Sequence, residues 1–178
     1  MPTEPTTGLQ PSDRSDRSDR SDRIMAAWRR ERPDLDPSSV AVITRIWHLA
    51  KLFDDERRRL LEGEGIERAV MDLLGTLRRS GEPHALTTRE ITARSTVSAG
   101  AISQRIARAE AQGWVTREPS PGRQVLVRLT PAGRRRVDDV AGRIFDHEDT
   151  LLTALDEPGR AQLAELLRTL TLALDPEA

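Results

Sequence analysis

The sequence contains no cysteine and no tyrosine, and aromatic residues make up only 3% of its 178 positions. The absence of cysteine excludes disulfides, thiolate metal sites and cysteine-based redox switches. With so few aromatic residues, the core must be built mainly from leucine, isoleucine, valine and alanine, as in packed helices. No run of 18 apolar residues is present, so no segment is predicted to span a bilayer. No secretory signal is visible, and we therefore expect a soluble, cytoplasmic protein.

Lysine is nearly absent too, since Lys51 is the single lysine among 28 basic residues. The formal net charge of −1 conceals an uneven distribution along the chain. Residues 87–136 carry ten arginines against three acidic residues, a net charge of +7, whereas residues 137–178 carry three against ten, a net charge of −7. A local basic block is what contact with phosphates requires. The middle of the chain is therefore a candidate nucleic-acid interface.

Residues 1–23 end in four consecutive copies of Ser-Asp-Arg and contain almost no apolar side chain. Such a segment cannot recover the entropy that ordering costs, so a disordered tail is expected. The repeated arginines leave a nucleic-acid arm as the alternative. Each arginine has an aspartate beside it, however, and the net field of the tail is close to zero.

Helical spacing of apolar residues dominates the rest of the chain. We expect a short helix from Ile24, a long one over residues 40–62, a third that ends near Gly81, and a last one over 158–174. The last helix carries a leucine stripe that the small central region cannot cover. Pairing with a second copy of the chain is the simplest way to bury it. We therefore assign residues 24–62 and 137–178 to dimerisation, and residues 63–136, which contain the basic block, to a DNA-binding lobe.

The pattern in residues 86–137 predicts a helix-turn-helix followed by a β-hairpin. Thr88 is the expected cap of the first short helix, and Ser98 is the expected N-cap of the second. The second helix should bury Ile102, Ile106 and Ala109 and end at Gly113. Two strand-like segments, "WVTREPS" and "RQVLVRLT", then flank a turn with proline and glycine. The fold class is therefore mainly α, with a small β-hairpin as the wing of a winged helix-turn-helix.

The run from Leu86 to Val137 resembles the multiple-antibiotic-resistance regulator (MarR) family. The motifs that carry the resemblance are "S-x-G-x-x-S-x-R-I-x-R-x-E-x-x-G-W-V" and, after the hairpin, "V-R-L-T-P-A-G". The resemblance implies a homodimeric, DNA-binding transcriptional regulator, more often a repressor, that is built from N- and C-terminal dimerisation helices. One departure lies at the wing tip, where "PSPGRQ" keeps Arg123 but lacks the family's acidic partner.

A narrower similarity concerns "W-R-R-E-R-P-D-L-D" near the N-terminus. It resembles the urate-responsive branch of the family, which has an extra N-terminal helix. This resemblance implies a small anionic ligand, urate or a related acid, bound by Trp28, Asp72, Arg105 and Arg117. It also implies that residues 24–62 contribute to the ligand cleft. An Asp72 carboxylate buried near arginine would be a bistable element, because a ligand anion could compete for the arginine.

The second helix of the helix-turn-helix is expected to read DNA. Small residues at its start let the backbone approach the major groove, and Gln104 can pair bidentately with adenine. The alternative is that its polar residues are simply a solvated face. The residues that we predict to contact DNA are Ser98, Ala99, Gly100, Ser103, Gln104, Arg105, Arg108, Arg117 and Arg123.

Other functions lack their residues in this sequence. There is no phosphate-binding glycine loop and no serine nucleophile signature with a histidine, so an enzyme is not expected. His48, His84 and His147 have no metal-ligand spacing, and neither a metal nor another cofactor is predicted. A winged helix that binds a protein, without a ligand response, stays open as the second interpretation.

Overall fold

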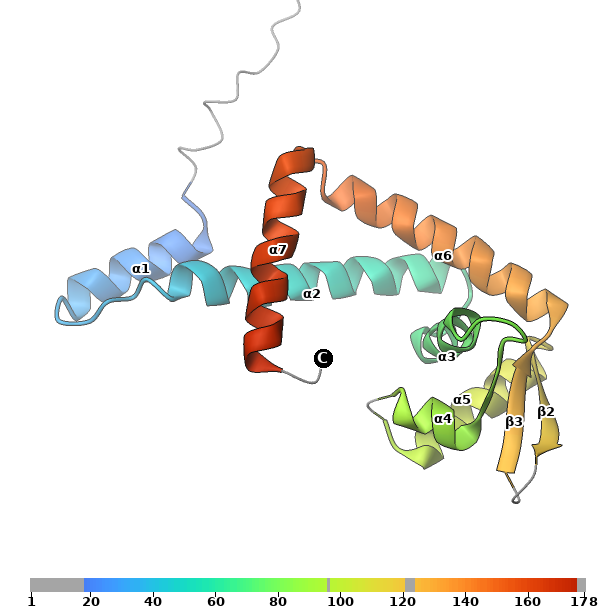
Figure 1. Cartoon of the computed structure of the whole chain (residues 1–178). Coiled ribbons are helices and arrows are strands. Elements are labelled where there is room, and N and C mark those ends of the chain that lie inside the picture. Colours follow the sequence, from blue (N-terminus) through green and yellow to red (C-terminus); the bar gives the residue numbers. More distant parts are fainter. Residues whose placement is uncertain (1–17, 96, 121–123, 176–178) are drawn as a thin grey trace, which may run out of the picture. The chain divides into compact units, whose positions relative to one another are not determined.

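The computed structural model describes residues 18–95, 97–120 and 124–175. In this part of the chain the fold consists of helices with one three-stranded antiparallel sheet (Figure 1). The chain divides into two compact units, residues 1–56 and 57–178. Among the described residues, no helix is long and apolar enough to cross a membrane.

The first unit contains α1 (Arg20–Glu31) and most of α2 (Val40–Gly63). Helix α1 begins inside the last Ser-Asp-Arg copies, four residues before the expected start at Ile24. Asp19 is its N-cap and forms a capping box with Asp22, and both carboxylates accept hydrogen bonds from Arg45 of α2, each at 2.7 Å. The Arg45 guanidinium lowers the pKa of Asp19 to about 2. The prediction of disorder was therefore wrong for residues 18–23, and residues 1–17 lie outside the described part.

The core of the second unit is formed by α3 (Arg68–Arg79), α5 (Ala99–Ala111) and α6 (Pro131–Leu151) packed against the sheet. Its buried side chains are almost all aliphatic, as the composition predicted. Leu74, Leu77, Val127 and Val140 are completely buried. The hydrophobic core runs from Leu61 to Ile144 and therefore includes residues on both sides of segment 63–136.

The sheet has the strand order β1-β3-β2, with every neighbouring pair antiparallel. Strands β2 (Val115–Ser120) and β3 (Gln124–Leu129) form the predicted hairpin. Strand β1 (Ala85–Thr87) was not predicted, because three residues are too few to show an alternating pattern. It exists through its pairing with β3, in which Leu86 lies opposite Val127.

The start of α6 approaches the junction of α5 and β2 very closely. The Thr130 amide donates to the Trp114 carbonyl at 3.0 Å, and the Thr130 hydroxyl accepts from the Gly133 amide as the N-cap. A Cβ on Gly133 would lie 1.9 Å from the Trp114 oxygen, so only glycine fits here. The "T-P-A-G" motif therefore has a packing reason: the proline starts the helix and the glycine permits the backbone contact.

Helix α7 (Glu157–Leu174) carries the expected leucine stripe, but no residue of α7 is buried. Large apolar side chains are also exposed along α2 in the first unit and at Phe145 of α6. The most exposed of them are Trp47 at 71%, Phe145 at 64% and Leu174 at 85%. The described chain therefore leaves these faces uncovered.

Replacing Gly133 with alanine should destabilise the second unit, because the added methyl group would collide with backbone that cannot move aside. We expect the free energy of unfolding to fall by about 2 kcal/mol, as is usual for overpacking. Gly142 in the middle of the same helix has nothing within 4 Å of its Cβ position and provides the matched control. Gly142→Ala should be neutral or stabilise by up to about 1 kcal/mol. Urea denaturation followed by circular dichroism measures both variants, and equal effects would contradict the packing argument.

Candidate nucleic-acid interface

The first helix of the helix-turn-helix is α4 (Thr88–Ala93), and its N-cap is Thr87 rather than the predicted Thr88. The Thr87 hydroxyl accepts from the Glu90 amide at 3.2 Å, and the Glu90 carboxylate accepts from the Thr87 amide at 2.7 Å. The Thr87 amide and the Thr87 hydroxyl both donate to the Glu90 carboxylate, and these two bonds lower the pKa of Glu90. Two adjacent threonines are equivalent as sequence signals, and Thr87 becomes the cap because it ends β1 with an extended backbone.

The second helix, α5, has the predicted N-cap, since Ser98 accepts a hydrogen bond from the Ala101 amide at 3.4 Å. One face of α5 is buried through Ile102, Ile106 and Ala109, as predicted. The predicted DNA-contacting residues of its first turns, namely Ala99, Gly100, Ser103 and Gln104, are all exposed. The helix thus combines an apolar face that attaches it to the core with a polar face that is accessible to a partner.

The Ser103 hydroxyl donates to the Ala99 carbonyl at 3.1 Å. Its proton is therefore occupied within the helix, while its oxygen keeps the capacity to accept a further hydrogen bond. This favours pairing with a donor on a base edge, such as an exocyclic amino group.

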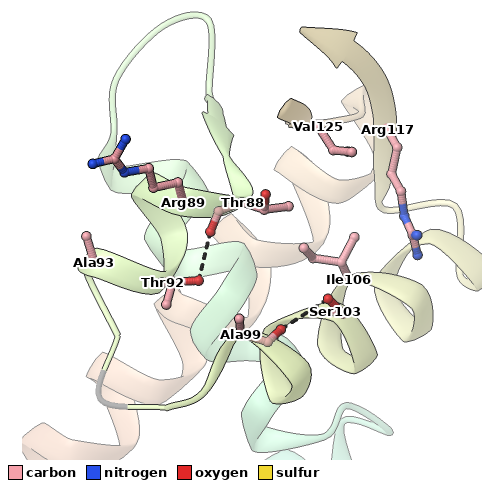
Figure 2. A pocket seen from close by; sticks show the side chains of 9 residues that line it. All are labelled: Thr88, Arg89, Thr92, Ala93, Ala99, Ser103, Ile106, Arg117 and Val125. Atoms are coloured by element: carbon pink, nitrogen blue, oxygen red, sulfur yellow. Dashed lines mark hydrogen bonds between the residues drawn. The ribbon is translucent and has the colours of Figure 1, made fainter. Parts of the chain in front are cut away.

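A hollow of about 660 Å³ lies between α4, α5 and the hairpin. Figure 2 shows Arg89 of α4 on one side of it and Arg117 of β2 on the other, with Ser103 between them. The two dashed hydrogen bonds in this view, from Thr92 to Thr88 and from Ser103 to Ala99, stay within their helices. Sequence reasoning missed Arg89 and the threonines of α4. Their only signal was a position in a short helix inside the basic block.

Two of the predicted arginines already have acidic partners at the edges of α5. Arg117 pairs with Glu110 at 3.0 Å. Arg108 pairs with Glu67, which precedes α3, and also donates to the Gln104 side chain at 3.5 Å. Arg117 and Glu110 are both partly exposed, so a phosphate can replace the Glu110 carboxylate at a modest cost.

Other arginines of the basic block hold the lobe together. Arg128 bridges to Glu118 across the hairpin at 3.0 Å, which lowers the pKa of Glu118. Arg134 pairs with Glu82 at 3.2 Å. Arg136 pairs with Glu64 at 3.4 Å and stacks over the Trp114 ring. Several of the ten arginines in the basic block are therefore already paired with carboxylates, and fewer of them are available to DNA than the net charge of +7 suggests.

The four predicted ligand residues are placed as follows. Trp28 lies on α1 of the first unit and is 49% exposed. Asp72 lies on α3, Arg105 on α5 and Arg117 on β2, all in the second unit. The expectation of a buried Asp72 carboxylate was wrong, because the residue is exposed. It follows an apolar run, but it occupies the solvent side of α3, whose other face packs into the core.

Arg123 lies outside the described residues. The described residues contain no group of three or more His, Cys, Asp or Glu side chains that could hold a metal ion. His84 is buried, and its Nε2 atom lies 3.0 Å from a Glu82 carboxylate oxygen.

The architecture and the exposed face of α5 define this chain as a winged helix-turn-helix protein. The sequence model of the MarR family matches residues 64–124. The HTH-type transcriptional regulator PecS of Dickeya dadantii is 30% identical over 146 residues, which cover 81% of this chain and 88% of PecS. The chain therefore belongs to the MarR family and is a DNA-binding transcriptional regulator, in agreement with the resemblance found in the sequence.

Solved structures agree with this assignment. A mutant of Escherichia coli MarR complexed with operator DNA is 26% identical, with a TM-score of 0.59, and the match covers 72% of this chain and 94% of that one. A MarR family transcriptional regulator from Streptomyces coelicolor in complex with DNA is 23% identical, with a TM-score of 0.65, and covers 79% and 90% of the two chains. At this identity, the second structure supports the fold alone.

The two threonines before α4 provide a direct test of the observed cap. Thr87→Ala removes the two hydrogen bonds of the Thr87 hydroxyl, with the Glu90 amide and with the Glu90 carboxylate, and should lower the free energy of unfolding by about 1 kcal/mol. Thr88→Ala is the control and should cost less than about 0.5 kcal/mol, because its hydroxyl is not the cap. Thermal and urea denaturation give both values. A larger loss for Thr88→Ala would contradict the cap assignment.

Proposed function

We propose that this protein is a homodimeric repressor that binds a pseudo-palindromic operator and is released from it by a small anionic ligand. The observation that carries the DNA part is the exposed polar face of α5, with Arg117 on one side and Arg108 on the other. Small side chains at the start of α5 allow the backbone to approach the floor of the major groove.

Within this proposal, Gln104 and Ser103 contact base edges, since both are exposed and carry hydrogen-bonding groups. Arg117 contacts a phosphate after leaving Glu110, whereas Arg108 stays paired with Glu67 and presents its remaining N–H groups to the DNA. The half-buried Arg105 is assigned to the same backbone contacts. Arg89 joins this group because it lines the same hollow as Arg117. Phosphate contacts position the helix, whereas base contacts select the sequence.

The uncovered apolar faces support the homodimer. Helix α7 has no buried residue although it carries leucines at helical spacing, and α2 exposes Val42, Ile43 and Trp47. Contiguous apolar faces of this kind usually mark an interface. A twofold dimer presents two copies of α5, and it selects half-sites about 10 base pairs apart.

The DNA part is tested with the duplex upstream of the protein's own gene. If six or more phosphates are neutralised, the affinity should fall about a thousandfold or more between 50 and 200 mM salt. Fluorescence anisotropy with the full-length protein measures this slope, and a duplex of scrambled sequence is the control for specificity. An affinity that stays constant over this range would refute the proposed interface.

The ligand part rests on the four residues of the urate-responsive resemblance, namely Trp28, Asp72, Arg105 and Arg117. The exposure of Asp72 and Trp28 leaves their side chains available to a ligand. An anion that pairs with Arg117 would compete with DNA for the same guanidinium. Such competition shifts the equilibrium from the DNA-bound to the free protein. The size of the shift depends on how much more tightly the free protein binds the ligand than the DNA-bound protein does.

Urate is the probe for this part. We expect it to lower the affinity of the wild-type protein for the operator, and Asp72→Asn to lose at least most of this response while it keeps its DNA affinity. Asp139→Asn on α6 removes an equal charge from another exposed aspartate and should respond like the wild type. Operator release titrated with urate measures the three proteins. A normal response of Asp72→Asn would contradict the role of this carboxylate.

A further inference from the structure

Glu67 lies in the turn between α2 and α3, directly before the first residue of α3. It is the N-cap residue of α3, but its side chain makes no capping hydrogen bond. Its carboxylate pairs instead with Arg108 of α5, the helix that carries the reading face. Of the described residues that line the small hollow at this place, Glu67 has the only carboxylate. Arg108 therefore has one acidic partner on this side of α5.

The Arg108 guanidinium joins two groups with its two terminal nitrogens. Nη1 donates to Glu67, and Nη2 donates to the Oε1 atom of Gln104 at 3.5 Å, one helical turn earlier. Glu67 thereby holds Arg108 in a position from which it reaches Gln104. Because a guanidinium has donors and no acceptor, Gln104 must turn its oxygen, and not its amino group, toward Arg108.

This orientation changes what Gln104 offers to DNA. A freely rotating glutamine amide pairs with adenine by accepting from N6 and donating to N7. When the oxygen is engaged by Arg108, the amino group with its two protons remains for the groove. Guanine presents two acceptors, N7 and O6, at its major-groove edge. An amide held in this way matches guanine better than adenine.

We propose that Glu67 is a specificity-determining positioning residue, which acts through Arg108 and makes Gln104 a reader of guanine. The inference rests on the proposed base contact of Gln104. Glu67 itself touches no base in this mechanism. Its influence is confined to the one base step that Gln104 reads in each half-site.

The experiment selects bound duplexes from a randomised pool with the full-length protein and compares the base preferences of variants. In the wild type, one step per half-site should prefer guanine, and Gln104→Ala should remove that preference and so identify the step. Glu67→Gln should shift this step toward adenine by about fivefold or more, the lower end of what one bidentate contact discriminates. Arg108→Lys keeps the charge but lacks the planar guanidinium that bonds to Glu67 and Gln104 at the same time, and it should cause the same shift.

Glu62→Gln provides the matched control, because it removes the same charge from an exposed glutamate of α2. It should leave the base preferences unchanged. Wild-type preferences in Glu67→Gln and Arg108→Lys, together with a lost preference in Gln104→Ala, would overturn the positioning role and leave the base contact standing. If Gln104→Ala leaves the base preferences unchanged, the base contact itself is refuted, and the inference with it. Circular dichroism confirms that each variant is folded.

Discussion

The close backbone contact between Gly133 and the Trp114 carbonyl is the constraint on which the DNA-binding lobe depends. Three elements meet at this contact: the end of α5, the start of the hairpin and the first turn of α6. Thr130 closes the junction by bonding to both the Gly113 and the Trp114 carbonyl oxygens. The directions of α5 and of the β2–β3 hairpin are therefore set by one junction. This is why a short motif after the hairpin carries so much of the family resemblance.

Electrostatics in the lobe follow a second pattern. Arginines are abundant, but acidic residues from neighbouring segments neutralise several of them in the folded chain. Glu64 and Glu67 lie in the same short turn after α2, and they pair with arginines of α6 and α5 respectively. The turn thus connects two helices of the lobe through two carboxylates. Exchange of the partly exposed Glu110 carboxylate for a phosphate at Arg117 costs little, which suits a protein that must bind DNA reversibly.

Local signals predicted much of the secondary structure. The cap Ser98, the buried face of α5 and the hairpin all follow from side-chain chemistry within a few residues. Three features depended on distant residues and were missed or misplaced. Strand β1 exists because β3 pairs with it, α1 begins early because Arg45 binds its capping aspartates, and Asp72 is exposed because α3 packs with its other face.

The sequence by itself determined the class of protein and the order of its helices and of the hairpin. Periodicity, capping residues and charge distribution are local properties, and a single chain segment is enough to express them. Only the tertiary structure decided which arginines are occupied by carboxylates and which side chain orients Gln104. Those pairs join residues that are far apart in the chain, such as Glu67 and Arg108, and their meeting is a consequence of helix packing that no local pattern contains.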